Sequence, residues 1–216
     1  MITLYGRKPV LEILLDPEAS IFRLHLAESN QRGDTITQIR KLARERDIDI
    51  ITHPKEALSR ISKNARQDQG VAIDIAPPKY QSVEQLSDNA GQLLALDGIT
   101  NPQNLGMIIR SVAASPMNGL LLPKKGCAKI DPLVHKASAG TLIKSSIYHC
   151  PTIESGLKSL QSNGYQLIGL SGGVDRSLGD IGNANEKTVF VLGNETTGIS
   201  EPVLALCDEL ACIPLE

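Results

Sequence analysis

Apolar and polar positions follow two different periods along residues 1–75, and both strands and helices are predicted there. Residues 21–26, 48–52 and 70–75 are short runs of the strand type. Residues 9–15, 35–46 and 54–61 carry apolar side chains at helical spacing. The alternation of these segments predicts a small α/β unit with its own core.

Strand, loop and helix patterns also alternate from residue 91 to the end of the chain. The strands are predicted at 93–96, 119–122, 166–170, 188–192 and 209–214, and the helices at 104–114, 132–143, 155–163 and 201–207. Continuous apolar strands between helices predict a parallel sheet that is covered on both faces. Residues 76–90 include Pro77 and Pro78, which cannot propagate a helix or a central strand. We therefore expect domains at 1–75 and 91–216 with a linker at 76–90.

The composition supports a folded, water-soluble chain. Of the 216 residues, 41% are hydrophobic and 21% are charged, which is enough to bury a core and excludes long disorder. No run of 18 apolar residues occurs, and the first residues lack a basic segment followed by an apolar one. The four cysteines form no CxxC pair, so we expect reduced, buried thiols and a cytoplasmic location.

Charge and motif content exclude several kinds of site. The formal net charge of -2 gives no global signature of a nucleic-acid partner, so any such contact must be local. Residues 40–66 hold eight basic and four acidic side chains, which fits either a nucleic-acid contact or the solvated face of two helices. The dinucleotide, P-loop, nucleophile-elbow and HExxH motifs are missing, and the four histidines are scattered without ligand spacing. We predict no metal site.

The first segment with candidate chemistry is residues 96–110. Asn101 and Pro102 turn the chain, a helix is predicted from about Asn104, and Arg110 follows six residues later, near the same helix face. Free N–H groups at a helix start, with an arginine alongside, can bind a phosphate. The alternative is that Asn104 is only a helix cap and Arg110 only a surface residue.

The second segment is residues 189–200, where a buried strand runs into a polar loop. Gly193 ends the strand and permits close approach of a ligand to the backbone. Glu195 follows at the carboxyl end of the strand, the edge at which parallel sheets bind their ligands. Its carboxylate either orients another group or accepts hydrogen bonds from N–H groups of its own loop.

Together these segments resemble the SpoU (TrmH-type) RNA 2'-O-ribose methyltransferases. The first family motif is matched by Asn104, Gly106 and Arg110. The second is matched by residues 192–195 with Gly198, and the start of the third by residues 211–215. Residues 1–75 resemble the family's ribosomal-protein-like substrate-binding domain, so the resemblance covers nearly the whole chain.

The resemblance implies a SPOUT-type methyltransferase domain with a trefoil knot, an S-adenosyl-L-methionine (SAM) pocket and a homodimer. It carries catalytic or RNA-orienting roles to Asn104, Arg110 and Glu195, and cofactor contacts to Leu192, Gly193, Ile213 and Leu215. RNA contacts are expected from Arg60, Lys63 and Arg66. The family's third motif continues beyond Glu216, so we expect the C-terminal end of the knot to be missing from this chain and its cofactor pocket to be half-walled.

The predicted function is SAM-dependent 2'-O-methylation of structured RNA, with ribosomal RNA favoured and transfer RNA the nearest rival. We expect Arg110 to hold the phosphate next to the target ribose and to lower the pKa of its hydroxyl, because a guanidinium is a poor general base. Glu195 and Asn104 would orient Arg110. The alternatives are a non-catalytic RNA-binding member of the same fold and a doubly wound nucleotide-binding protein without RNA.

Overall fold

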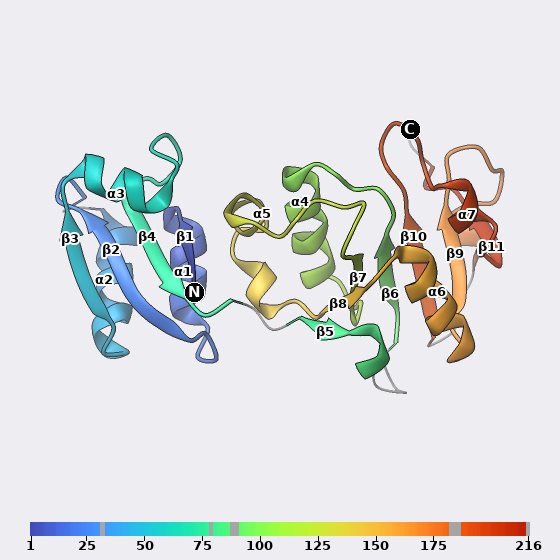
Figure 1. The fold of residues 1–216 in the computed structure, drawn as a ribbon, viewed down its shortest axis with the longest axis horizontal. Coiled ribbons are helices and arrows are strands. Elements are labelled where there is room, and N and C mark those ends of the chain that lie inside the picture. The colour runs from blue at the N-terminus through green and yellow to red at the C-terminus, as the bar shows by residue number, and fades with distance from the viewer. Residues whose placement is uncertain (31–32, 78–79, 87–90, 182–186, 215–216) are drawn as a thin grey trace. The chain divides into compact units, whose positions relative to one another are not determined.

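The computed structural model describes residues 1–30, 33–77, 80–86, 91–181 and 187–214 (Figure 1). The chain divides into two units. The first consists of Met1–Lys79 together with Ile130–Lys144, and the second of Tyr80–Lys129 together with Ser145–Glu216. A segment between two strands of the second unit thus packs with the first.

The first unit is built on a four-stranded sheet with the order β1-β4-β2-β3. Its strands are β1 (Ile2–Tyr5), β2 (Ile21–Ala27), β3 (Asp49–His53) and β4 (Val71–Ile75). Its helices are α1 (Arg7–Leu15), α2 (Asp34–Glu45), α3 (Lys55–Ser62) and α5 (Pro132–Ala137), followed by the short helix η2 (Thr141–Lys144). Strand β4 runs antiparallel to β1 and β2, and β3 runs parallel to β2. The three predicted helices and three predicted strands are confirmed, whereas strand β1 was not predicted.

Neighbouring side chains of β1 pack against helices on opposite faces of this sheet. Leu4 is buried in a cluster with Val10 and Ile13 of α1 and Ile39 of α2. Its neighbour Tyr5 points to the other face and packs with Leu58 of α3. Successive side chains of a strand point to opposite faces, so α3 lies across the sheet from α1 and α2.

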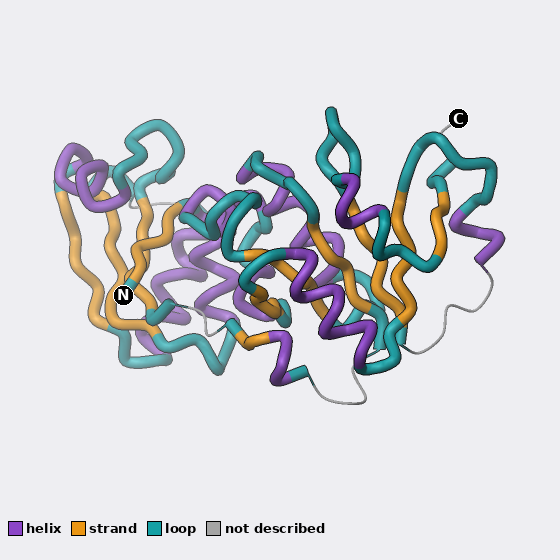
Figure 2. The backbone as a smooth tube through the Cα atoms, turned by 45° about the vertical axis from the view of Figure 1, so that its right-hand side comes forward, coloured by secondary structure: helices purple, strands orange, loops and turns teal. Residues whose placement is uncertain are grey.

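The second unit is built on a seven-stranded sheet with the order β11-β9-β10-β6-β7-β8-β5, and every pairing is parallel. The strands are β5 (Gln81–Ser82), β6 (Leu93–Leu96), β7 (Gly119–Pro123), β8 (Ile147–Cys150), β9 (Gln166–Leu170), β10 (Thr188–Leu192) and β11 (Glu209–Ala211). The helices are α4 (Pro102–Ala113), α6 (Ile153–Ser162) and α7 (Glu201–Leu204), with the short helices η1 (Val83–Gln85) and η3 (Leu178–Ile181). Figure 2 draws the strands in orange and the helices in purple, and the strands of this sheet lie side by side. The predicted parallel sheet is confirmed.

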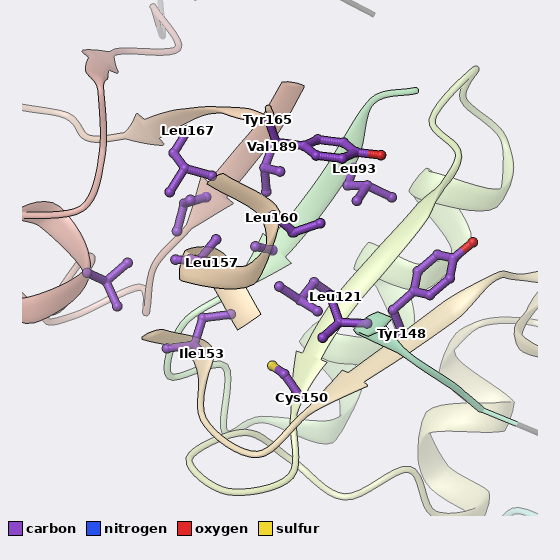
Figure 3. Close-up of a cluster of buried hydrophobic side chains, with 14 of the residues drawn as sticks. Leu93, Leu121, Tyr148, Cys150, Ile153, Leu157, Leu160, Tyr165, Leu167 and Val189 are labelled. Atoms are coloured by element: carbon purple, nitrogen blue, oxygen red, sulfur yellow. The ribbon is translucent and has the colours of Figure 1, made fainter. Parts of the chain in front are cut away.

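Helices α6 and α4 cover opposite faces of this sheet. Leu157 and Leu160 of α6 are buried against Leu121 and Val189, and Figure 3 shows these side chains gathered in one cluster. Each fully buried leucine contributes about 1.5–3 kcal/mol to folding. Residues that alternate with this cluster along β6, such as Leu94, lie instead on the side of α4.

The structure differs from the sequence-based expectations at four elements. The helix predicted over 132–143 ends at Ala137, because Ala139 and Gly140 adopt positive φ angles of 53° and 89°, which interrupt an α-helix. Strand β8 was not predicted. The last helix and the last strand are both shorter than the apolar pattern suggested, ending at Leu204 and Ala211.

The cysteines are less buried than expected. All four are free thiols, but only Cys150 is buried, while Cys127, Cys207 and Cys212 are half-buried. Burial raises the pKa of the Cys150 thiol to about 12, which keeps it protonated and unreactive at neutral pH. Within the described parts of the chain, none of the helices has the length and apolarity that a bilayer crossing requires.

Candidate active site

The candidate site lies at the carboxyl edge of the parallel sheet, where the strand order changes direction. Strand β6 is followed in sequence by its neighbour β7 on one side, while its other neighbour, β10, comes from much later in the chain. Ligands of parallel sheets bind at such a switch point. A pocket of about 950 Å³ opens there, lined by α4, by the ends of β9 and β10, and by Ile213.

Asn104 and Glu195 meet at this pocket. The side-chain amide of Asn104 donates a hydrogen bond to Glu195 Oε1, although 91 residues separate them in sequence. Asn104 is not the helix cap: Asn101 Oδ1 accepts the backbone N–H of Gln103 at 2.8 Å, and the helix begins at Pro102. The capping alternative for Asn104 is therefore wrong.

Glu195 is exposed and its pKa lies below the ordinary value. The first cause is its own backbone N–H, and the second is the amide of Asn104; both stabilise the ionised form. The carboxylate thus accepts hydrogen bonds from its own backbone N–H and from the amide of Asn104, and its role in orienting another group stays a prediction.

Replacing Asn104 should move the titration of Glu195. With Asn104→Ala, we expect the Glu195 pKa to rise toward its ordinary value, because one donor to the carboxylate is lost. Because the pKa of Glu195 is lowered, the stability that the Asn104–Glu195 hydrogen bond contributes is fully present above the ordinary carboxyl pKa. It is lost as the pH falls through the lowered pKa of the folded protein. Carbon-13 NMR titration of the Glu195 carboxyl measures both values. Identical titration curves for wild type and Asn104→Ala would contradict the bond.

Gly193 is required by the loop itself. A Cβ atom on Gly193 would overlap the backbone of Gly198 and Ile199. The two backbone strands of this turn are joined by reciprocal hydrogen bonds of 2.9 Å between Asn194 and Gly198. The absence of a side chain at Gly193 therefore first allows the backbone of its own loop to pack closely, before any ligand is considered.

Asn194 holds this loop in place, and the sequence-based selection missed it. Its Nδ2 donates to the carbonyl of Gly98 at 2.8 Å, and its Oδ1 accepts the N–H of Thr196 at 2.9 Å. The loops after β6 and β10 are thereby joined. The available signal was its position between Gly193 and Glu195 in the second motif.

Three of the four predicted cofactor residues line the pocket. Leu192 and Gly193 line it, and so does Ile213, which is 53% exposed. Leu215 lies outside the described residues. The pocket is also lined by residues 170–172, which were not singled out; the signal for them was the Ser-Gly-Gly sequence directly after a predicted strand.

Arg110 does not share a helix face with Asn104. Six residues advance an α-helix by about 600°, which leaves Arg110 roughly 120° around the axis from Asn104. Met107 and Ser111 share the pocket-facing stripe with Asn104, whereas Arg110 is exposed and is not among the lining residues. The expectation that Asn104 and Arg110 lie near one face is wrong, and the two donors are not side by side.

The basic segment 40–66 separates into groups with different roles. Arg46 is structural, because its guanidinium donates to the carbonyls of Leu14, Asp16 and Ala19 at the end of α1, at 3.0, 2.7 and 2.8 Å. Lys41 pairs with Glu45 on α2. The predicted RNA contacts Arg60, Lys63 and Arg66 are all exposed, at the end of α3 and in the loop that follows.

Two family models match the chain. Residues 91–216 match the SpoU rRNA methylase family, and residues 3–81 match a model described as RNA 2'-O ribose methyltransferase substrate binding. The chain belongs to the SpoU rRNA methylase family. The predicted family and its N-terminal substrate-binding domain are confirmed, and the protein is an RNA methyltransferase rather than a plain nucleotide-binding protein.

Similar proteins agree with this assignment. An uncharacterized tRNA/rRNA methyltransferase of Mycolicibacterium smegmatis is 32% identical over 97% of this chain and 68% of its own length. The SpoU methyltransferase AviRb of Streptomyces viridochromogenes, crystallised with AdoMet, has the same fold with a TM-score of 0.80 at 21% identity, over 99% of this chain and 81% of its own. The structure of a TrmH-family protein from Porphyromonas gingivalis has a TM-score of 0.74 at 24% identity. The match covers 100% of this chain and 80% of that one. The predicted SPOUT-type fold class is confirmed, while the knot itself stays a prediction.

No group of three or more histidine, cysteine, aspartate or glutamate residues suited to a metal ion occurs in the described ranges.

Proposed function

We propose that this SpoU protein transfers a methyl group from SAM to a ribose 2'-hydroxyl of structured RNA, with ribosomal RNA as the substrate. The observation that carries the proposal is the Asn104–Glu195 hydrogen bond at the strand-switch pocket, which joins the first and second family motifs in one site. The matched substrate-binding model, whose description names RNA 2'-O ribose methyltransferases, supports the position of the methyl group.

The pocket suits SAM in size and in the character of its walls. Its volume of about 950 Å³ lies in the range of cofactor sites, roughly 300–1,000 Å³. Leu192 and Ile213 offer apolar surface for an adenine ring, and the backbone near Gly193 offers polar groups for its edge. When bound, SAM supplies a methyl group on a sulfonium that a nucleophile can displace in line.

The protein's own residues contribute mainly by positioning, which can supply much of the rate of such a displacement. Arg110 is exposed in the last turn of α4 and, in this proposal, binds the phosphate next to the target ribose. Its charge lowers the pKa of the 2'-hydroxyl, whose proton passes to phosphate or water. The described residues show no hydrogen bond from Arg110 to Asn104 or Glu195, so those two residues shape the pocket mouth rather than hold Arg110 directly.

A transfer assay distinguishes the substrates. Purified ribosomal and transfer RNA, unmodified because they are transcribed in vitro, are incubated separately with the full chain and methyl-labelled SAM. We expect 2'-O-methylated nucleosides from ribosomal RNA after nuclease digestion and mass spectrometry. Label in transfer RNA alone would replace the proposed substrate, label on a base would refute the 2'-O position, and RNA binding without transfer would indicate a non-catalytic member.

We also propose that residues 1–75 select the RNA and that residues 91–216 carry the reaction, joined by residues 76–90. Replacing Arg60, Lys63 and Arg66 together by Ala should weaken RNA binding and flatten its salt dependence by about one unit of slope per lost phosphate contact. Filter binding at several salt concentrations measures both. The control replaces Lys8, Lys41 and Arg44, which are exposed on α1 and α2 across the sheet. Equal slopes for the two triple variants would show that the α3 group is only a solvated surface.

The homodimer implied by the resemblance, and the cytoplasmic location, remain predictions. Light scattering of the full chain over a range of concentrations tests the first, and a single-copy mass at all concentrations would contradict it.

A further inference from the structure

His135 is a buried histidine whose ring has no hydrogen-bond partner. Its exposed fraction is 1%, and neither Nδ1 nor Nε2 is bonded to any described residue. Burial lowers its pKa to about 4, against a smaller opposite effect of Asp131, so the ring is neutral at physiological pH. A neutral imidazole has one donor and one acceptor, and proteins rarely bury both without partners.

His135 is one of the residues that line a pocket within the first unit. This pocket has a volume of about 590 Å³ and lies between β1, the end of α3 and the start of α5. It belongs to a different unit from the methyl-transfer site and shares no lining residue with it.

Most other polar side chains of this pocket already have partners within the protein. Thr3 donates to Asp74, Asn64 donates to the hydroxyl of Tyr5, and Ser62 donates to Asp68. Asp131 accepts the N–H groups of Leu133 and Val134 and so caps α5. Among the polar side chains that line the pocket, the imidazole of His135 and the exposed ammonium of Lys63 are the two without a hydrogen bond to the described residues.

The chemistry of these two groups matches a nucleotide. An imidazole donor and acceptor fit the edge of a nucleobase, and an ammonium fits its phosphate. Lys63 sits at the αL C-cap of α3, with φ of 54°, between Arg60 and Arg66 in sequence. Sequence-specific recognition of RNA commonly uses bases that are unstacked from loops and bonded at their edges.

We propose that this pocket holds one unstacked nucleotide of the RNA substrate, with the base bonded to His135 and the phosphate beside Lys63. The identity of the partner as RNA rests on the proposed function. The pocket would give the substrate-binding unit a means of reading a base, in addition to the sequence-independent attraction of its basic residues.

Nitrogen-15 NMR of the full chain tests the contact directly. The four ribonucleoside 5'-monophosphates are added separately at about 10 mM, which is ten times a weak Kd of about 1 mM. We expect at least one to shift the His135 ring signals, while ribose 5-phosphate and inorganic phosphate do not. The rings of His25, His53 and His149 serve as internal controls in the same spectra. No shift with any nucleotide, or equal shifts with ribose 5-phosphate, would overturn the proposal.

Two variants separate recognition from a structural role. His135→Phe keeps the ring volume and removes the unpaired nitrogens, so we expect Tm to rise by about 3 °C or more. Nucleotide affinity should fall about tenfold, while His135→Gln, which retains a donor and an acceptor, keeps most of it. A fall of Tm in His135→Phe would show that the imidazole serves the fold, and would overturn the assignment.

Failure of this inference and failure of the proposed function give different experimental results. SAM binding and methyl transfer to ribosomal RNA are measured on the wild-type chain, independently of the pocket in the first unit. Transfer to RNA without any nucleotide effect at His135 would refute this inference alone. Nucleotide binding at His135 in a chain that methylates no RNA would refute the proposed function alone.

Discussion

Arg110→Ala is expected to abolish methyl transfer while leaving the affinity for SAM within a few-fold of wild type. Arg110 is exposed and does not line the pocket, so its proposed contact is to RNA and not to the cofactor. Hydrogen bonds to charged groups contribute roughly 1.5–3 kcal/mol, which corresponds to at least a tenfold loss of rate. Single-turnover transfer to ribosomal RNA measures the rate, and isothermal titration measures SAM affinity.

Two controls sharpen this experiment. Arg110→Lys keeps the charge but loses the planar pair of donors, so it should retain RNA binding better than Arg110→Ala and still transfer slowly. Lys158→Ala removes an exposed charge on α6 and should change neither rate nor affinity. If Arg110→Ala transferred methyl groups at half the wild-type rate, Arg110 would have no essential part in the reaction.

Gly193→Val is expected to remove SAM binding and to destabilise the chain even without the cofactor. The sequence suggested that a side chain at Gly193 would block the ligand. In the structure, the added side chain would first overlap the backbone of Gly198 and Ile199. Forcing a branched side chain into packed backbone costs about 1–3 kcal/mol or more, and it opens the loop that carries Glu195. Thermal unfolding of the cofactor-free protein and titration with SAM measure the two effects.

Gly198 supplies the matched control for Gly193. It lies in the same loop with φ of 69°, and a Cβ atom there would meet nothing within 4 Å. Asparagine tolerates this backbone region, so Gly198→Asn should retain the stability of the cofactor-free chain. Because Gly198 also lines the pocket, this control applies to the unfolding measurement and not to the SAM titration. A folded Gly193→Val protein with wild-type SAM affinity would show that the pocket does not depend on this loop.

Much of the architecture could be predicted from local patterns. The five strands predicted after residue 91 are all present, because a strand buried on both faces must be apolar along its whole length. The parallel pairing followed from the helices between them. The pattern missed β1 and β8, because polar residues interrupt their short sequences, Ile-Thr-Leu-Tyr and Ile-Tyr-His-Cys, so neither stands out as an apolar run.

Local sequence also identified the loops of the candidate site, but not their arrangement. The glycine at 193 and the polar residues after it stand out in an apolar context, and they do line the pocket. The local sequence did not predict how these side chains are arranged. A separation of a little under two helical turns suggested that Arg110 lies near the face of Asn104. An offset of six residues in fact leaves the two about 120° apart around the helix axis.

What the sequence determined by itself is the set of elements and the chemical character of the loops between them, because helix and strand periods depend on neighbours a few residues away. Only the tertiary structure decided that Asn104 bonds to Glu195, 91 residues later, and that Gly193 packs against its own loop. It alone placed residues 130–144 with the first unit and left His135 without a partner there. These pairings depend on strand order and chain crossovers, and a periodicity that is local in sequence carries no information about which distant segments come to lie side by side.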